Sequence, residues 1–158
     1  MRRRDCLFAF GAATLVGMTQ SGSALAGSGR LVVVVGRSHP LDSVSLGMLR
    51  RIFLAQPVDA DGVRIVPFNA SPLSSERVLF DRRVLGWSAE ETARHWVDQR
   101  IRGKPGPPRT IAGVRLLKQV VERLAGAIGY LDSEDLDGTV KALPVAGYEW
   151  THEDYPIR

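Results

Sequence analysis

Apolar residues occur along this chain in short continuous runs and in helical stripes, and the runs predict strands. Residues 31–35 read LVVVV, which is typical of a strand buried on both faces, as in a parallel sheet. We expect this strand to be central. Residues 63–68 are β-branched or aromatic at most positions and too short for a helix, which favours a second buried strand. Residues 127–131 and 140–143 are read as two further strands.

Two stretches between these strands carry apolar stripes at helical spacing. In residues 46–53 the apolar side chains lie on one face of a predicted helix, and Ser43 or Ser45 can cap the N-terminus of this helix. Another helix is predicted after the 63–68 strand, ending at about Leu85, with one stripe packed on the sheet. Three charged positions of that helix are expected to face water: Arg77, Asp81 and Arg82.

Two more helices are predicted later in the chain. Ser88 followed by Glu91 forms a capping box, and the helix that it opens is expected to end near Ile101. Its packed side chains should be Ala89, Ala93, Trp96 and Val97. Residues 114–124 form the last long amphipathic helix, stopped by Gly126. Strands that alternate with helices predict an α/β domain with a mostly parallel sheet flanked by helices.

The first 26 residues have the pattern of an export signal. Three arginines precede an apolar stretch, and Ala24 to Ala26 supplies the small residues of a signal-peptidase site. Arg3 and Arg4 also fit a twin-arginine signal, although an ordinary secretory signal fits almost as well. We therefore expect a periplasmic protein cleaved near Ala26, with residues 27–158 forming one domain.

The cysteine content and the net charge argue against a disulfide-stabilised domain and against nucleic-acid binding. The one cysteine, Cys6, lies in the expected signal, so the mature domain would have no disulfide. Removing residues 1–26 lowers the formal charge from +4 to +2. The basic character of the whole chain is thus no argument for nucleic-acid binding, and we expect no nucleic-acid partner.

A serine-rich turn at residues 69–75 is the candidate binding site. It joins the 63–68 strand to the following helix, and such a turn presents free backbone N–H groups at the positive end of a helix, which can bind an anion. The alternative is simple capping, by Ser71 before Pro72 or by Ser74 one turn later. Glu76 would repel an anion.

Catalytic and metal-binding patterns are not found in the sequence. The three histidines, His39, His95 and His152, fall in separate elements without the spacing of zinc ligands. No G-x-S-x-G, P-loop or G-x-G-x-x-G motif occurs. We expect a protein that is not an enzyme, with no metal and no cofactor.

A basic, proline-rich loop at residues 100–109 and an aromatic tail at residues 147–158 complete the chain. The loop can attract an anion, contact a negatively charged partner or membrane surface, or simply connect two elements, and the last is the commonest role of such loops. The tail, with Trp150 and Tyr155, has no predicted position.

Several of these motifs together resemble a known family. The order of elements, with LRRIFL at residues 49–54, the Ile65-Val66-Pro67 strand, the serine turn and GAIGY at residues 126–130, resembles the phosphate-binding proteins of phosphate ABC transporters. The resemblance implies one lobe of a type 2 periplasmic binding protein. In that family a Ser-Gly-Thr turn holds the phosphate; here it reads Ser74-Ser75-Glu76, and Asn69 stands where an arginine is usual.

The resemblance implies an exported solute-binding protein that holds a small anion such as phosphate and works with a transporter permease. The alternative is a single-lobe module that has lost its ligand and contacts another periplasmic or membrane protein. Ser38 is included in the candidate site because ligands of parallel sheets gather at the carboxyl ends of strands. The candidate ligand-binding residues are Ser38, Asn69, Ser71, Ser74, Ser75 and Arg77.

Overall fold

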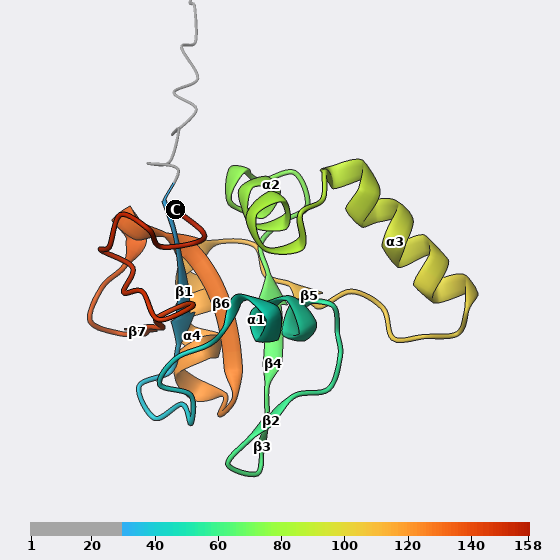
Figure 1. The fold of residues 1–158 in the computed structure, drawn as a ribbon. Helices are drawn as coiled ribbons and strands as arrows, with labels where there is room; N and C mark the ends of the chain where they lie inside the picture. Colours follow the sequence, from blue (N-terminus) through green and yellow to red (C-terminus); the bar gives the residue numbers. More distant parts are fainter. Residues whose placement is uncertain (1–29) are drawn as a thin grey trace, which may run out of the picture.

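A five-stranded sheet, seen in a computed structural model that describes residues 30–158, forms the centre of the protein (Figure 1). The expected signal, residues 1–26, lies outside the described residues. The strand order is β5-β4-β6-β1-β7. The strands are β1 (Leu31–Val35), β4 (Val66–Asn69), β5 (Arg109–Thr110), β6 (Ala127–Asp132) and β7 (Lys141–Ala142), with a separate hairpin of β2 (Asp59–Ala60) and β3 (Val63–Arg64).

Strand directions confirm the predicted fold class with one exception. β4 is parallel to both β5 and β6, whereas β1 is antiparallel to both β6 and β7. Four of the five strands of this sheet therefore run in one direction, as expected for an α/β fold with a mostly parallel sheet. β1 lies inside the sheet and is fully buried, as its LVVVV sequence predicts, but its expected parallel pairing is wrong. Burial on both faces does not determine strand direction.

Helices cover both faces of the sheet. α1 and the α2–η1 segment contribute to a core on one face, together with Leu31, Val33 and Val35, while α4 packs with Val32 and Val34 on the other. Side chains of β1 thus alternate between the two cores. The helices are α1 (Leu46–Phe53), α2 (Ser75–Phe80), the π-helix η1 (Asp81–Leu85), α3 (Ala89–Ile101), α4 (Val114–Arg123) and the 3-10 helix η2 (Ser133–Asp135).

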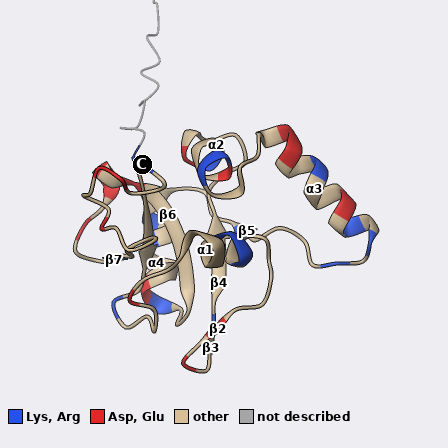
Figure 2. Ribbon diagram, in the orientation of Figure 1, with Lys and Arg blue, Asp and Glu red and all other residues tan. Residues whose placement is uncertain are grey.

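Helix α3 projects from the side of the molecule (Figure 1). Its capping box forms as predicted: the Ser88 N–H donates to Glu91 Oε2 at 2.7 Å, and the Glu91 N–H donates to Ser88 Oγ. The predicted packing is wrong except at Trp96, because Ala89, Ala93 and Val97 are exposed. Acidic and basic residues follow one another along α3 (Figure 2). The helix is therefore solvated on most of its surface.

The tail, for which the sequence predicts no position, packs against the sheet. Tyr155 and Ile157 are buried in the core that contains α1. The Tyr155 hydroxyl donates to the carbonyl of Leu143 at 3.2 Å and accepts from the N–H of Val33 at 3.3 Å. The tail thus bridges β1 and the segment after β7. In the described residues, no helix is long and apolar enough to cross a membrane.

Replacing Tyr155 by phenylalanine is expected to lower the free energy of unfolding by about 1–3 kcal/mol, since two buried backbone groups lose a partner. Urea denaturation measures the change. Tyr148→Phe is the matched control in the same tail, because Tyr148 is 38% exposed. Equal, small effects of both variants would show that the bridge does not stabilise the fold.

Candidate functional site

The serine turn lies between the end of β4 and the start of α2. Ser74, rather than Ser71, is the N-cap of α2, and its Oγ accepts from the N–H of Arg77 at 3.2 Å. The N–H of Ser74 donates to the carbonyl of Ser71 at 3.0 Å, which closes the turn. One of the two capping positions expected from the sequence is therefore used, and Ser71 keeps its hydroxyl for other contacts.

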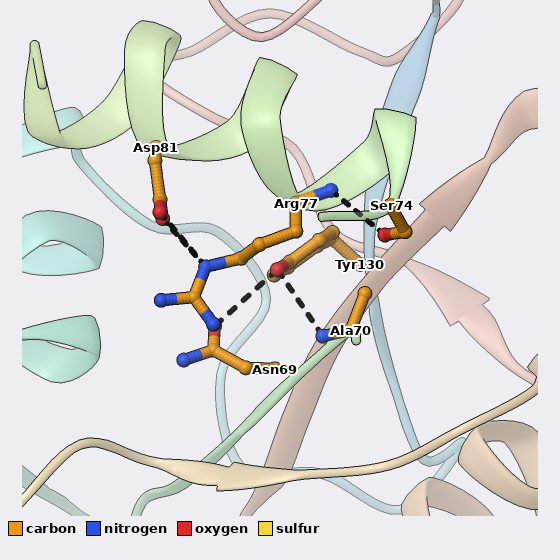
Figure 3. A network of polar contacts seen from close by, with 6 residues as sticks. All are labelled: Asn69, Ala70, Ser74, Arg77, Asp81 and Tyr130. Atoms are coloured by element: carbon orange, nitrogen blue, oxygen red, sulfur yellow. Dashed lines mark hydrogen bonds and ion pairs between the residues drawn. The ribbon is translucent and has the colours of Figure 1, made fainter. Parts of the chain in front are cut away.

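Tyr130 of the GAIGY motif fixes the base of this turn (Figure 3). Its hydroxyl donates to Asn69 Oδ1 at 3.3 Å and accepts from the N–H of Ala70 at 3.2 Å. Its ring stacks on Phe80, with centroids 3.9 Å apart. Burial raises the pKa of Tyr130, so the phenol remains protonated and keeps its hydrogen-bond donor. The turn is thus attached to the core at both its strand and helix sides.

The glycines of the same motif allow β6 to approach neighbouring elements closely. A Cβ at Gly129 would lie 2.8 Å from the side chain of Leu117, so glycine lets α4 pack directly on β6. At Gly126, with φ of +81°, a Cβ would lie 2.2 Å from the carbonyl oxygen of Arg64. Gly129 therefore lets α4 pack on β6, and Gly126 lets the start of β6 approach the residues that precede β4.

A cavity of about 140 Å³ lies between the serine turn and the start of α4. Ser71, Ser74 and Glu76 line one side, and Gly113 and Val114 line the other. The buried Tyr130 also borders it. The volume corresponds to a few water molecules, at about 30 Å³ each in the liquid, and so to one small ion rather than a large ligand.

Hydrogen-bond donors are concentrated at this cavity. Ser74 Oγ accepts from Arg77, so its own proton is directed elsewhere. The N–H groups of Ser75 and Glu76 lie in the first helical turn, where the helix offers them no acceptor. The N-cap of α4, Gly113, has no side chain to satisfy the first N–H groups of that helix. Two helix starts therefore direct positive partial charge to the same cavity.

Arg77 is placed differently from the sequence-based expectation. Arg77 and Asp81, both expected to face water, are buried, with 9% and 3% of their surface exposed. They form an ion pair in which Nε of Arg77 lies 2.8 Å from Asp81 Oδ2 (Figure 3). Burial raises the pKa of Asp81, and the adjacent Arg77 opposes that rise. Arg77 borders a different cavity, between α2 and α3, and not the one at the serine turn.

The other expected site residues are only partly brought together. Asn69 lies behind the turn, with its amide oxygen engaged by Tyr130, and Ser75 is exposed, with its hydroxyl 3.3 Å from Glu76 Oε2. Ser38 follows β1, and Val35 of that strand pairs with Ile128 near the start of β6. Because β1 is antiparallel, Ser38 lies at the edge of the sheet opposite the serine turn. The reason for including Ser38 therefore does not hold.

The sequence-based reasoning did not assign a site role to Tyr130, Gly113 or Val114. Gly113 directly precedes an amphipathic stripe without a capping side chain, which is a signal for an open helix start. Tyr130 is a polar-tipped residue in a buried strand, and buried tyrosines usually have a hydrogen-bond partner. Among the described residues, no group of three His, Cys, Asp or Glu side chains is arranged to hold a metal.

No protein-family profile and no curated protein matches the chain. Solved structures do. A protein described as a phosphate ABC transporter substrate-binding protein, from Clostridium perfringens and with bound phosphate, matches 78% of this chain and 48% of its own at TM-score 0.63 and 22% identity. A phosphate transport receptor from Vibrio cholerae matches 80% and 52%, at TM-score 0.65 and 17% identity.

PstS from Borrelia burgdorferi also matches, over 81% of this chain and 53% of its own, at TM-score 0.57 and 13% identity. The chain thus spans about half the length of these solved structures. The resemblance seen in the sequence is confirmed in the fold: these neighbours are substrate-binding proteins, and the described residues share their architecture.

Proposed function

We propose that this chain, which has the fold of phosphate ABC transporter substrate-binding proteins, binds a small inorganic anion at the serine turn without changing it chemically. Phosphate is the first candidate because one neighbour of the same fold is described with bound phosphate. The proposal includes export of the chain and action beside a transporter permease. It assigns no catalysis, metal or cofactor to the protein.

The observation that carries the proposal is the meeting of two helix starts at one cavity. The ligand donors that we assign are the hydroxyl groups of Ser71 and Ser74 and the backbone N–H group of Glu76, three residues that line the cavity. The start of α4, at Gly113 and Val114, lines the opposite side of the cavity. Tyr130 fixes the base of the turn through Asn69 and Ala70, so the turn needs little reorganisation on binding, which favours affinity.

Glu76 gives the proposed site a preference among anions. Glu76 lines the cavity, and a carboxylate there would repel a fully deprotonated anion. Hydrogen phosphate still carries a proton that it can donate to this carboxylate, whereas sulfate has none at neutral pH. We therefore assign Glu76 as an acceptor that selects protonated oxyanions.

Replacing Ser74 by alanine is expected to weaken phosphate binding about tenfold or more, because a hydrogen bond to a charged ligand is lost. Calorimetric titration of residues 27–158 with phosphate and sulfate measures it. Ser45→Ala is the matched control: Ser45 caps α1 in the same way, accepting from the N–H of Met48 at 3.1 Å. Both variants lose an N-cap, but only Ser74→Ala should lose affinity.

Glu76→Gln should reduce the preference for phosphate over sulfate. Two results would overturn the proposal: no saturable heat with phosphate at millimolar concentration in the folded protein, or equal affinity in the Ser45 and Ser74 variants. Equal binding of sulfate and phosphate by the unaltered chain would remove the role given to Glu76.

Exposed apolar residues favour a second candidate function, a module that contacts another protein. Leu73 beside the serine turn is 87% exposed, and Val97 and Ile101 on the projecting α3 are 60% and 80% exposed. Val97 and Ile101 are four residues apart and so lie on one face of α3, and adjacent exposed apolar side chains are typical of interaction sites. Co-purification of a periplasmic or membrane partner, lost with Val97→Asp and Ile101→Asp, would support this function.

A further inference from the structure

Helix α3 has little support from the rest of the fold. It projects from the molecule (Figure 1), and among the described residues it makes few contacts with the other helices and strands. Thr92 and Trp96 are its buried residues. A helix of 13 residues is marginally stable in water by itself, because most helices depend on the packing of an apolar face. The outward side of α3 is therefore a candidate contact surface.

The outward side of α3 carries a row of apolar residues. Ala89, Ala93, Val97 and Ile101 follow one another at intervals of four, so they form one row along the helix, and all four are exposed. Leu73, which is 87% exposed, adds to the alanine end of this row, because it lines the same cavity between α2 and α3 as the two alanines. We call these five residues the α3 face. Rows of residues four apart are the ridges through which helices commonly pack.

The α3 face has a hollow end and a raised end. The alanines border a cavity of about 290 Å³, whereas Val97 and Ile101 stand out from the surface, 60% and 80% exposed. If two copies lay antiparallel, with a twofold axis between residues 93 and 97, Val97 of each copy would meet Ala93 of the other, and Ile101 would meet Ala89. Small side chains opposite large ones let two helices approach to about 8–10 Å between their axes. The α3 face is therefore complementary in shape to itself.

The charges at the two ends of α3 are complementary as well (Figure 2). Glu90 and Glu91 lie in the first turn, Arg100 lies in the last turn, and Arg102 is the C-cap. Glu90 already contacts Arg94, but a carboxylate has two oxygens and can accept from a second cation. Antiparallel pairing sets the acidic end of one helix beside the basic end of the other and opposes the two helix dipoles.

We propose that the α3 face is the contact surface of a symmetric, antiparallel dimer of this chain. The proposal rests on the second candidate function above, a module that contacts another protein, and it identifies the partner as a second copy. It does not depend on the anion site at the serine turn. A foreign protein would account for the exposure of Val97 and Ile101, but not for the hollow, acidic end of the same helix that matches them.

The proposed dimer is weak and reversible, because one pair of 13-residue helices buries less than the roughly 800 Å² per chain of a standard interface. Sedimentation equilibrium of the purified protein should show a mass that rises from one chain toward two between about 10 µM and 1 mM. Val97→Asp places a charge in the contact and should hold the mass at one chain. Leu116→Asp is the matched control, since Leu116 is 50% exposed on α4, outside the α3 face, and this variant should associate like the unaltered chain.

Charge exchange tests the antiparallel arrangement. Glu90→Arg alone, or Arg100→Glu alone, sets like charges against each other at both ends of the contact and should weaken association about fivefold or more. A mixture of the two variant chains restores opposite charges at both ends, so mixed dimers should form as readily as dimers of the unaltered chain. Damage to the fold of either variant would not be repaired by mixing. Recovery in the mixture therefore supports the proposal.

Three results would overturn the proposal: a mass of one chain at every concentration tested, the same loss of association in Val97→Asp and Leu116→Asp, or no recovery in the mixture. If the unaltered chain stays monomeric but retains another protein through the α3 face, the second candidate function stands with a foreign partner and the dimer does not. Ser74→Ala should leave the mass unchanged, so failure of the anion site and failure of the dimer are separate results.

Discussion

Gly126→Ala is expected to lower the free energy of unfolding by about 3–5 kcal/mol. This value is the sum of two costs: alanine is disfavoured in the left-handed conformation, and its Cβ would severely overpack the site. The new Cβ would lie 2.2 Å from the backbone oxygen of Arg64, which cannot rotate away as a side chain can. The N–H of Val66 donates to the Gly126 carbonyl at 2.9 Å, so any shift also disturbs β4, which leads into the serine turn. Urea denaturation, with circular dichroism as the signal, measures the loss.

Gly62→Ala is the matched control for this prediction. Gly62 has a similar φ, +76° against +81°, but a Cβ there would have no neighbour within 4 Å. Its substitution should cost about 1–2 kcal/mol, the cost of the left-handed conformation alone. If the two variants were equally destabilised, the close approach between Gly126 and Arg64 would make no contribution to the loss of stability.

Arg77→Leu is expected to destabilise the protein by about 3–5 kcal/mol at neutral pH, because it leaves the Asp81 carboxylate buried without its cation. The loss should depend on pH. Burial already raises the pKa of Asp81, and removing Arg77 raises it further, so the folded variant binds a proton that the unfolded chain releases above about pH 4. Stability of Arg77→Leu relative to the unaltered protein should therefore fall as the pH rises from about 4 to 7.

Two further variants test the cause of this effect. Arg94→Leu removes an ion pair of the same i,i+4 spacing and the same 2.8 Å distance, but one that is exposed, and should cost at most about 0.5 kcal/mol. The double variant Arg77→Leu, Asp81→Leu removes both buried charges and should recover much of the lost stability. A double variant as unstable as Arg77→Leu would show that packing, not charge, is responsible.

Most of the elements could be predicted because their local signals agree. The stripe of α1, the capping box of α3 and the apolar run of β1 each follow from residue type and spacing, and all appear in the structure. Strand direction could not be predicted in the same way. It depends on which backbone β1 pairs with, and the LVVVV sequence is equally compatible with either direction.

The burial of Arg77 and Asp81 shows a second limit. Charged residues on a predicted helix are normally assigned to solvent, but at i,i+4 spacing they can neutralise each other, and the segment that follows α2 is then able to pack inward. The opposite error occurred on α3, where apolar Val97 is exposed. In both cases the contact partner, not the residue type, decides burial, and a single sequence does not identify that partner.

For the candidate site, the sequence located the turn but not its supports. Ser71 and Ser74 line the cavity as the turn predicts, whereas the opposite wall comes from Gly113 and Val114, about forty residues later. Tyr130, which fixes the turn, lies in a third element. These contacts are formed only when β4, β6 and α4 come together, so periodicity within any one element does not reveal them.

The position of β1 also has a consequence for the order in which the protein folds. Both strands that pair with Leu31–Val35 lie more than 90 residues later in the chain. During synthesis, this run of valines therefore remains without its native partners until residues 127–142 have been made. Such distant pairing slows folding, and an unpaired apolar β-segment is prone to aggregate in the meantime. The nascent chain is thus expected to need a holding chaperone for longer than its small size would indicate.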